Sequence, residues 1–322
     1  MKPLFLFSLP RAGSTLAQRI LASHSEIATV SEPWLLLPFL YALKERGIYA
    51  EYGHFMLPEA IKDFCSKLPN GQEDYLSELR ELVMRLYGKA ARQEVAYFLD
   101  KTPRYHLIVD EIIQLFPDGK FIFLWRHPLA VLASIIETWA KGSWNLYCYK
   151  VDIFKGLENL ISAYLKYQDC AYAIQYENLI ENQEEELPKL LSYLDLPADQ
   201  SDLILSNPAE LKGRWSNPAN SKKYESISNQ PLEKWKQTLA NPIRKAWCRD
   251  YLKWIGEERL AVMGYSLNQI LVELDSIPLT FHKIDSDIVR MTYGITHCAL
   301  EPYLMKQKLQ NLNDWKWIYT HA

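Results

Sequence analysis

The sequence predicts an α/β fold with a central parallel sheet of about four to five strands. Short apolar runs alternate with longer segments whose apolar residues recur at helical spacing. The clearest run is Phe121–Trp125, five consecutive apolar residues of the kind found in a central strand buried on both faces. Strands that alternate with helices are typical of doubly wound parallel sheets. A chain of 322 residues can bury such a core as one large domain or two small ones.

The predicted elements follow from this pattern and from the residues that bound them. Strands are expected at residues 4–7, 27–30, 96–99, 121–125 and 171–175, and helices at residues 14–23, 73–93, 105–116, 128–139, 153–170, 181–193, 231–239 and 242–256. Pro33 restricts Glu32 to extended geometry, so the chain leaves the second strand there. Pro128 suits the first turn of a helix, and Asn241 before Pro242 is a preferred helix cap.

The domain organisation is predicted from the Pro, Gly and polar residues that separate these elements. We expect residues 1–264 to form one domain, in which residues 34–95 are a helical insertion over the sheet edge. That insertion either encloses a substrate or is plain helical packing. Residues 206–230 are rich in Ser, Asn and Pro and predict a long loop. Residues 265–322 are expected to be a helical C-terminal extension packed on the same domain.

Composition argues against several classes of function. The net charge of −3 implies no general surface for nucleic acid, so any phosphate recognition must be local. The five cysteines form no C-x-x-C pair and no metal-ligand spacing, which indicates a reducing, cytoplasmic setting and no bound metal. The longest apolar stretch, Leu35–Leu43, contains Pro38 and is far too short to span a membrane. The oligomeric state is left open.

The first strand leads into a loop that has the layout of a phosphate cradle. Ser8-Leu-Pro-Arg-Ala-Gly-Ser-Thr15 lies between an apolar run and a helix, so backbone N–H groups at the helix start can face an anion. The loop departs from the nucleoside-triphosphatase pattern G-x-x-x-x-G-K-[ST] because Ser14 replaces the lysine and Arg11 supplies the charge. It therefore predicts an anion site that is not suited to Mg-bound ATP.

A second anion site is predicted after the strand over residues 121–125. Arg126 leaves the end of that strand, where ligands bind in open α/β sheets, and Ser134 lies about two helical turns further on. A guanidinium and a hydroxyl are both suited to phosphate. Taken alone, an Arg at this place is more often a structural ion pair. Two such sites on neighbouring strands predict a ligand with phosphate at both ends.

At this point the chain resembles sulfotransferases that use PAPS, 3′-phosphoadenosine 5′-phosphosulfate. Residues 8–15 look like the family's 5′-phosphosulfate loop in the Arg form of its bacterial and protein-tyrosine branches, and residues 126–134 look like its 3′-phosphate motif. Asp100-Lys-Thr-Pro103 and Gln175-Tyr-Glu-Asn-Leu179 are similar to recurrent family segments. The resemblance covers roughly residues 1–260 and implies a P-loop-like three-layer fold.

The resemblance also implies roles for individual residues. The residues expected to bind the nucleotide are Arg11, Ala12, Gly13, Ser14, Thr15, Arg126, Ser134, Tyr176, Ser226 and Lys234. Glu32 stands where the Arg branches have a glutamate base, and Lys101 corresponds to a lysine that, with Arg11, stabilises the leaving group. From position alone, Glu32 is more often an exposed or salt-bridged glutamate than a base, and Lys101 is equally well interpreted as a surface partner of Asp100. His127, where relatives often have Asp, is interpreted as a local cap or pairing residue.

The function implied is in-line transfer of the sulfuryl group from PAPS to a hydroxyl or amine of a small acceptor, such as a secondary metabolite. A carrier-tethered acyl or peptide substrate is the closest alternative. From another class, the alternatives are an Mg-ATP-dependent kinase and a non-catalytic nucleotide-binding protein. The kinase is disfavoured because the loop lacks its lysine and the strand over residues 121–125 ends in Arg126 rather than an acidic residue that holds Mg²⁺.

Overall fold

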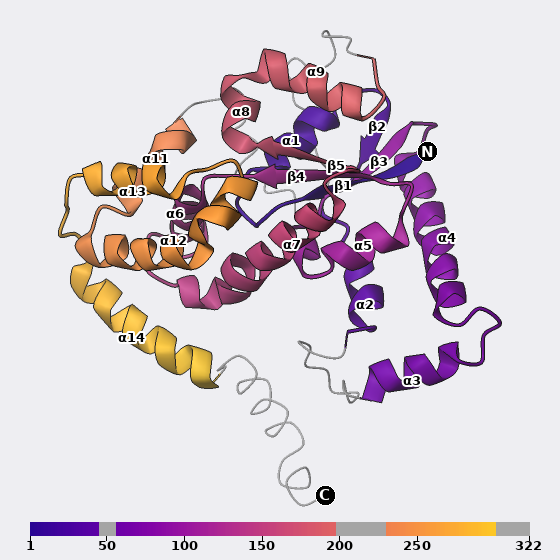
Figure 1. Cartoon of the computed structure of the whole chain (residues 1–322), viewed down its shortest axis with the longest axis horizontal. Coiled ribbons are helices and arrows are strands. Elements are labelled where there is room, and N and C mark those ends of the chain that lie inside the picture. The colour runs from indigo at the N-terminus through magenta and orange to yellow at the C-terminus, as the bar shows by residue number, and fades with distance from the viewer. Residues whose placement is uncertain (45–55, 198–229, 301–322) are drawn as a thin grey trace, which may run out of the picture.

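A five-stranded parallel sheet forms the centre of the molecule, as seen in a computed structural model that describes residues 1–44, 56–197 and 230–300 (Figure 1). The strands are β1 (Lys2–Phe7), β2 (Ile27–Thr29), β3 (Tyr97–Asp100), β4 (Lys120–Trp125) and β5 (Ala171–Gln175). Their order across the sheet is β2-β3-β1-β4-β5, with Leu4 of β1 opposite Leu99 of β3 and Lys120 of β4. The predicted parallel α/β fold and all five predicted strands are confirmed.

Helices cover both faces of the sheet and make three layers (Figure 1). One face carries α1 (Ser14–Leu21), α8 (Tyr176–Glu181) and α9 (Gln183–Tyr193). The other carries α5 (Val109–Leu115), α6 (Pro128–Thr138), α7 (Leu157–Tyr167) and α12 (Pro242–Val262). This layering places the loop after β1 and the loop after β4 side by side at one edge of the sheet, because the carboxyl ends of parallel strands share an edge.

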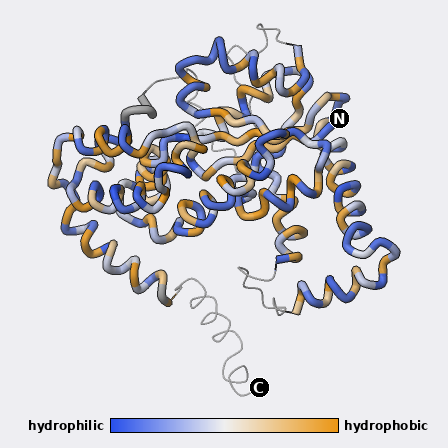
Figure 2. Tube along the Cα trace, viewed as in Figure 1, coloured by the Kyte–Doolittle hydropathy of each residue, from blue (hydrophilic) through white to orange (hydrophobic). Residues whose placement is uncertain are grey.

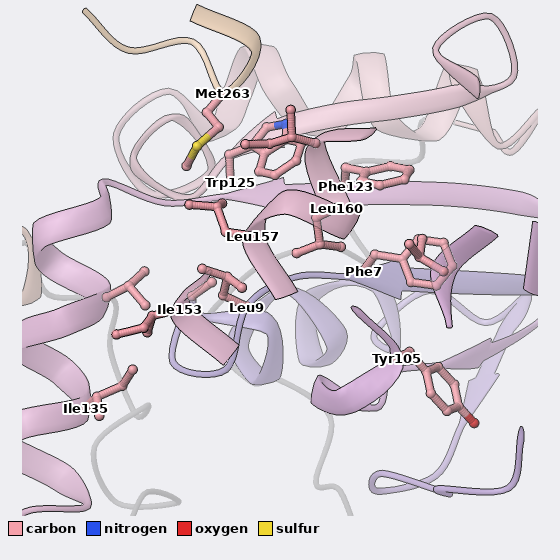
Figure 3. Packing of buried hydrophobic residues seen from close by; sticks show 14 of the residues in the cluster. Phe7, Leu9, Tyr105, Phe123, Trp125, Ile135, Ile153, Leu157, Leu160 and Met263 are labelled. Carbon is pink, nitrogen blue, oxygen red and sulfur yellow. The ribbon is translucent and has the colours of Figure 1, made fainter. Parts of the chain in front are cut away.

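The core explains why the strands read as unbroken apolar runs. Along β1, Leu4 and Leu6 belong to the cluster under α1, α8 and α9, whereas Phe5 and Phe7 belong to the cluster on the opposite face. Figure 3 shows Phe7 and the β4 side chains Phe123 and Trp125 together with Leu157 and Leu160 of α7. Figure 2 shows hydrophobic residues running through the central strands and hydrophilic residues on the outer turns of the helices.

Two of the predicted helices are broken in the structure. The expected helix over 105–116 is a short 3₁₀ turn, η1 (Pro103–Leu107), followed by α5. The expected helix over 153–170 begins with a π-helical turn, η3 (Val151–Gly156), before α7. The two irregular turns pack against each other: the fully buried His106 ring of η1 lies against Gly156 of η3, where an added Cβ would lie 2.7 Å from His106 Nδ1.

The predicted insertion comprises α2 (Leu36–Tyr41), α3 (Met56–Cys65) and α4 (Gln72–Ala91). The long helix α4 contacts β2 and β3 and buries Leu79, Val83 and Tyr87, so it does lie over that sheet edge. Residues 45–55 lie outside the described residues. Whether this insertion encloses a substrate stays a prediction.

The C-terminal part of the described chain is helical. It contains α11 (Gln230–Thr238), α12, α13 (Leu267–Ser276) and α14 (Ile284–Leu300), and α12 is kinked at Gly256. The expected cap is confirmed, since the Asn241 side chain accepts hydrogen bonds from two backbone N–H groups of α12. Helix α14 packs on α12 and on η2 (Leu146–Tyr149). Residues 206–229 and 301–322 lie outside the described residues, and the assignment of 265–322 as one extension stays a prediction.

No helix of the described ranges is both long enough and apolar enough to cross a membrane.

Candidate active site

The loop after β1 enters α1 through a glycine in the left-handed conformation. Gly13 caps α1 with a φ of 92°, and a Cβ added there would lie 2.2 Å from the Tyr176 ring. Arg11 also adopts a left-handed φ of 67°, which is strained for a residue with a side chain. Ser14 and Thr15 open α1, where backbone N–H groups have no partner within the helix. The loop therefore has the strained, N–H-rich geometry of an anion cradle.

The two predicted anion motifs meet at Arg11. Arg11 Nε donates to Ser134 Oγ at 3.2 Å, and its Nη2 donates to Thr138 Oγ1 at 3.1 Å. Arg126 Nη1 in turn donates to the Arg11 carbonyl at 2.8 Å. Residues 115 or more positions apart in the sequence thus fix one another at the carboxyl ends of β1 and β4. Thr138 escaped the sequence reasoning, although it lies one helical turn beyond Ser134.

Tyr176 joins the same group of residues from the end of β5. Its ring lies under the Arg126 guanidinium, with 4.4 Å from Cζ to the ring centroid, a cation–π contact. The ring is buried and also packs against Gly13. Tyr176 thereby links the loop after β1 to the loop after β4. Ala12 is buried in the core beside this loop.

Glu32 and Lys101, which follow β2 and β3, form a close ion pair. Lys101 Nζ donates to Glu32 Oε1 at 2.7 Å, and only 3% of the Lys101 side chain and 16% of the Glu32 side chain are exposed. The Trp34 indole N–H reaches the second carboxylate oxygen of Glu32 at 3.4 Å. Burial lowers the pKa of Lys101, because an ammonium group loses its hydration there. The alternative of a surface Lys101–Asp100 pair is wrong, since Lys101 is buried and pairs with Glu32.

The segment that carries Glu32 is anchored at both ends. The fully buried Gln18 side chain donates to the Thr29 hydroxyl and to the Val30 carbonyl, both at 2.8 Å. Beyond Glu32, the Trp34 N–H donates to Thr102 Oγ1 and the Leu36 N–H donates to the Tyr105 hydroxyl, both at 3.2 Å. The carboxylate therefore lies on a short loop that hydrogen bonds hold on both sides of Glu32.

Asp100 lies beneath this loop as a buried carboxylate. It accepts hydrogen bonds from Tyr87 at 2.6 Å, from Tyr105 at 2.9 Å and from Thr102 at 3.2 Å. Burial raises the pKa of Asp100 to about 6, although these hydrogen bonds and the nearby Lys101 charge act in the opposite direction. Because Tyr105 and Thr102 also hold the Glu32 segment, Asp100 supports the site from below. The Asp100-Lys-Thr-Pro103 segment was the available sequence signal, but nothing pointed to Tyr87.

The remaining predicted residues do not join this group within the described chain. Lys234 is exposed on α11, and Ser226 lies outside the described residues. The His127 ring stacks on Trp235 at 4.8 Å and meets the Tyr265 ring edge-on at 5.8 Å, while neither ring nitrogen has a hydrogen-bond partner in the structure described. Burial and the Arg126 charge lower the pKa of His127 to about 3, so the ring is neutral. The expected capping or pairing role of this ring is wrong.

Comparison with known proteins agrees with this geometry. A sequence model of the sulfotransferase family matches residues 3–200. The nodulation protein NoeE of Sinorhizobium fredii is 24% identical over 261 residues, which are 73% of this chain and 60% of that protein. Protein-tyrosine sulfotransferase 1 of Danio rerio is 24% identical over 73% of this chain and 66% of its own length. The chain thus matches only part of NoeE.

The fold agrees as well. The solved sulfotransferase domain from the curacin biosynthetic pathway superposes with a TM-score of 0.53 at 21% identity, over 86% of this chain and 98% of that domain. At this identity the likeness concerns the fold, and the family model carries the assignment because it spans more than half of the chain. The chain belongs to the sulfotransferase family.

Proposed function

We propose that this protein transfers a sulfuryl group from PAPS to a hydroxyl or amine of a small acceptor. The observation that carries the proposal is the contact between the two anion motifs at Arg11. Its guanidinium donates hydrogen bonds to Ser134 and Thr138, and its carbonyl accepts a hydrogen bond from Arg126. A nucleotide with phosphate groups at both ends matches two joined cradles better than a triphosphate does. Bound PAPS would supply the sulfuryl group and a bisphosphate leaving group.

The residues present fit such a donor. Gly13 leaves the loop backbone open beside α1, where N–H groups and the helix dipole favour an anion. Arg126 and Ser134 would hold the 3′-phosphate, and Ala12, Ser14 and Thr15 the 5′ end. Tyr176, already packed against Gly13 and Arg126, would border the nucleotide. Ser226 and Lys234 remain proposed contacts on the family resemblance alone.

Glu32 would act as the general base. Its carboxylate is fixed by Lys101 and Trp34 and remains partly exposed, so it is available to an acceptor. It would take the proton from the acceptor O–H or N–H as a new bond to sulfur forms and the bond from sulfur to the bridging oxygen breaks. Lys101 and Arg11 would offset the negative charge that grows on that oxygen. The Glu32–Lys101 pair thus places a base and a cation within 2.7 Å of each other.

The test is transfer of label from ³⁵S-labelled PAPS to a panel of phenols, alcohols and amines. We expect the wild-type protein to label at least one acceptor and Glu32→Gln to lose nearly all transfer while still binding adenosine 3′,5′-bisphosphate. Undiminished transfer by Glu32→Gln would contradict the role of the base. Failure of the wild type to bind the bisphosphate would contradict the proposal that PAPS is the donor.

A further inference from the structure

Arg104 is a fixed cation three residues beyond Lys101. Its Nε lies 3.1 Å from Asp152 Oδ1, and Asp152 is buried. The same carboxylate oxygen lies 2.7 Å from His106 Nε2, so Asp152 is itself held in place. One edge of the Arg104 guanidinium is thereby fixed, while 36% of the side chain is exposed.

The outer edge of this guanidinium is open within the described part of the chain. Its two terminal nitrogens, Nη1 and Nη2, make no hydrogen bond to any described residue. A guanidinium presents five N–H donors in a planar fork whose geometry matches a carboxylate. Asp152 uses the Nε side, and the fork at Nη1 and Nη2 is left for a ligand.

An aromatic wall connects this cation to the proposed sulfuryl site. The Arg11 guanidinium lies 5.9 Å from the centroid of Trp139, and the Trp139 ring meets the Tyr149 ring at 4.9 Å. The indole of Trp139 is 41% exposed. Tyr149 lies three residues before Asp152, the ion-pair partner of Arg104, and the Arg104 charge opposes the rise that burial causes in the pKa of Tyr149. The wall therefore runs from Arg11 through Trp139 and Tyr149 to Arg104.

The proposed base, Glu32, is linked to Arg104 through one short segment of the chain. Three residues span at most about 11 Å, so the Cα atoms of Lys101 and Arg104 cannot lie farther apart than that. Lys101 contacts Glu32, the proposed base. The contact to the proposed base and the Arg104 fork thus come from one short segment of the chain, Lys101 to Arg104.

We propose that Arg104 is a specificity-determining residue that binds the carboxylate of a hydroxylated acceptor whose body lies on Trp139 and Tyr149. This inference rests on the proposed function and adds a substrate class to it: small hydroxy acids. The cation is preorganised, because Asp152 and His106 hold it before a ligand arrives. Neutral acceptors of the same shape lack the group that the open fork of Arg104 recognises.

The test uses a panel of small aromatic and aliphatic hydroxy acids, each paired with its neutral methyl ester. Each is titrated calorimetrically into the full-length protein saturated with adenosine 3′,5′-bisphosphate. We expect at least one acid to bind 10-fold or more tighter than its ester, as charge-assisted bidentate bonds allow. In Arg104→Gln the preference falls to within about 2-fold, and bisphosphate affinity is unchanged. Arg104→Lys keeps the charge beside Asp152 and loses most of the preference, because a lysine has no fork.

The control is Lys155→Gln, which removes one positive charge from a neighbouring segment where the side chain is 65% exposed. This variant keeps the full acid preference. The proposal is overturned if no acid in the panel binds better than its ester, or if the preference survives in both Arg104 variants. In either case intact bisphosphate binding leaves the proposed function standing. Loss of bisphosphate binding by the wild type contradicts the proposed function instead.

Discussion

The proposed donor side and the proposed acceptor side of the site are built in different ways. The donor side consists of two contiguous motifs, residues 8–15 and 126–134, whose side chains and backbone lock together at Arg11. The proposed acceptor side is assembled from Arg104, Trp139 and Tyr149, which come from three separate segments and are partly exposed. A contiguous cradle suits a ligand shared by a whole family, whereas a surface assembled from short connecting segments suits a ligand that differs between members.

The largest effect is expected at the junction of the two sides. Glu32→Gln removes the proposed base but keeps a side chain of similar size beside Lys101. We expect kcat to fall about 1,000-fold, within the range for loss of a general base, with bisphosphate affinity nearly unchanged. Steady-state kinetics with labelled PAPS, combined with calorimetry, separates the two quantities. A fall in bisphosphate affinity as large as the fall in kcat would place Glu32 on the donor side instead.

The next effect isolates the donor side. Arg126→Ala removes the guanidinium that stacks on Tyr176 and donates to the Arg11 carbonyl. We expect adenosine 3′,5′-bisphosphate to bind about 100-fold more weakly, because hydrogen bonds to charged groups contribute roughly 1.5–3 kcal/mol each. Calorimetry measures the loss. An affinity within 3-fold of the wild type would show that Arg126 is only a structural support of the loop.

The buried Asp100 beneath the Glu32 loop predicts a pH dependence of the free energy of unfolding. Burial raises the pKa of Asp100 from 3.8 to about 6, so between these values the native state binds more protons than the unfolded state. The free energy of unfolding therefore decreases as the pH rises from about 4 to about 6, by up to roughly 3 kcal/mol from this group. Asp100→Asn cannot titrate and should lack this component.

Urea unfolding of both proteins at a series of pH values checks the Asp100 prediction. The wild type should lose stability relative to Asp100→Asn as the pH rises through this window, and the difference should level off above it. Parallel curves for the two proteins would show that Asp100 does not titrate there.

The smallest predicted effect tests the shape of the cradle. Gly13→Ala forces a side chain into left-handed backbone and against the Tyr176 ring, so we expect bisphosphate affinity to fall about 10-fold. The matched control is Gly256→Ala, because Gly256 also has a positive φ but has open space around it. The control should lose roughly 1–3 kcal/mol of stability, because its backbone region is essentially restricted to glycine, and should keep its affinity. Equal bisphosphate affinities for the two variants would show that the close contact between Gly13 and Tyr176 does not contribute to bisphosphate binding.

The difference between the two sides also sets what the sequence could predict. The strands, the loop at Gly13 and the motif over residues 126–134 follow from local patterns, since each depends on neighbours in the sequence. The Glu32–Lys101 pair depends on the order of β2, β3 and β1 in the sheet, so the sequence indicated both residues but not their contact. The broken helix at His106 and the Arg104–Asp152 pair depend on packing between distant segments, which no local pattern encodes.

The central claim is that the joined cradles bind a nucleotide with phosphates at both ends. Calorimetric titration with adenosine 3′,5′-bisphosphate, against ATP with Mg²⁺ as the control, tests it most directly. The account predicts tight bisphosphate binding that needs no metal and weak binding of Mg-ATP. Metal-dependent binding of ATP with no preference for the bisphosphate would contradict the account and favour a kinase.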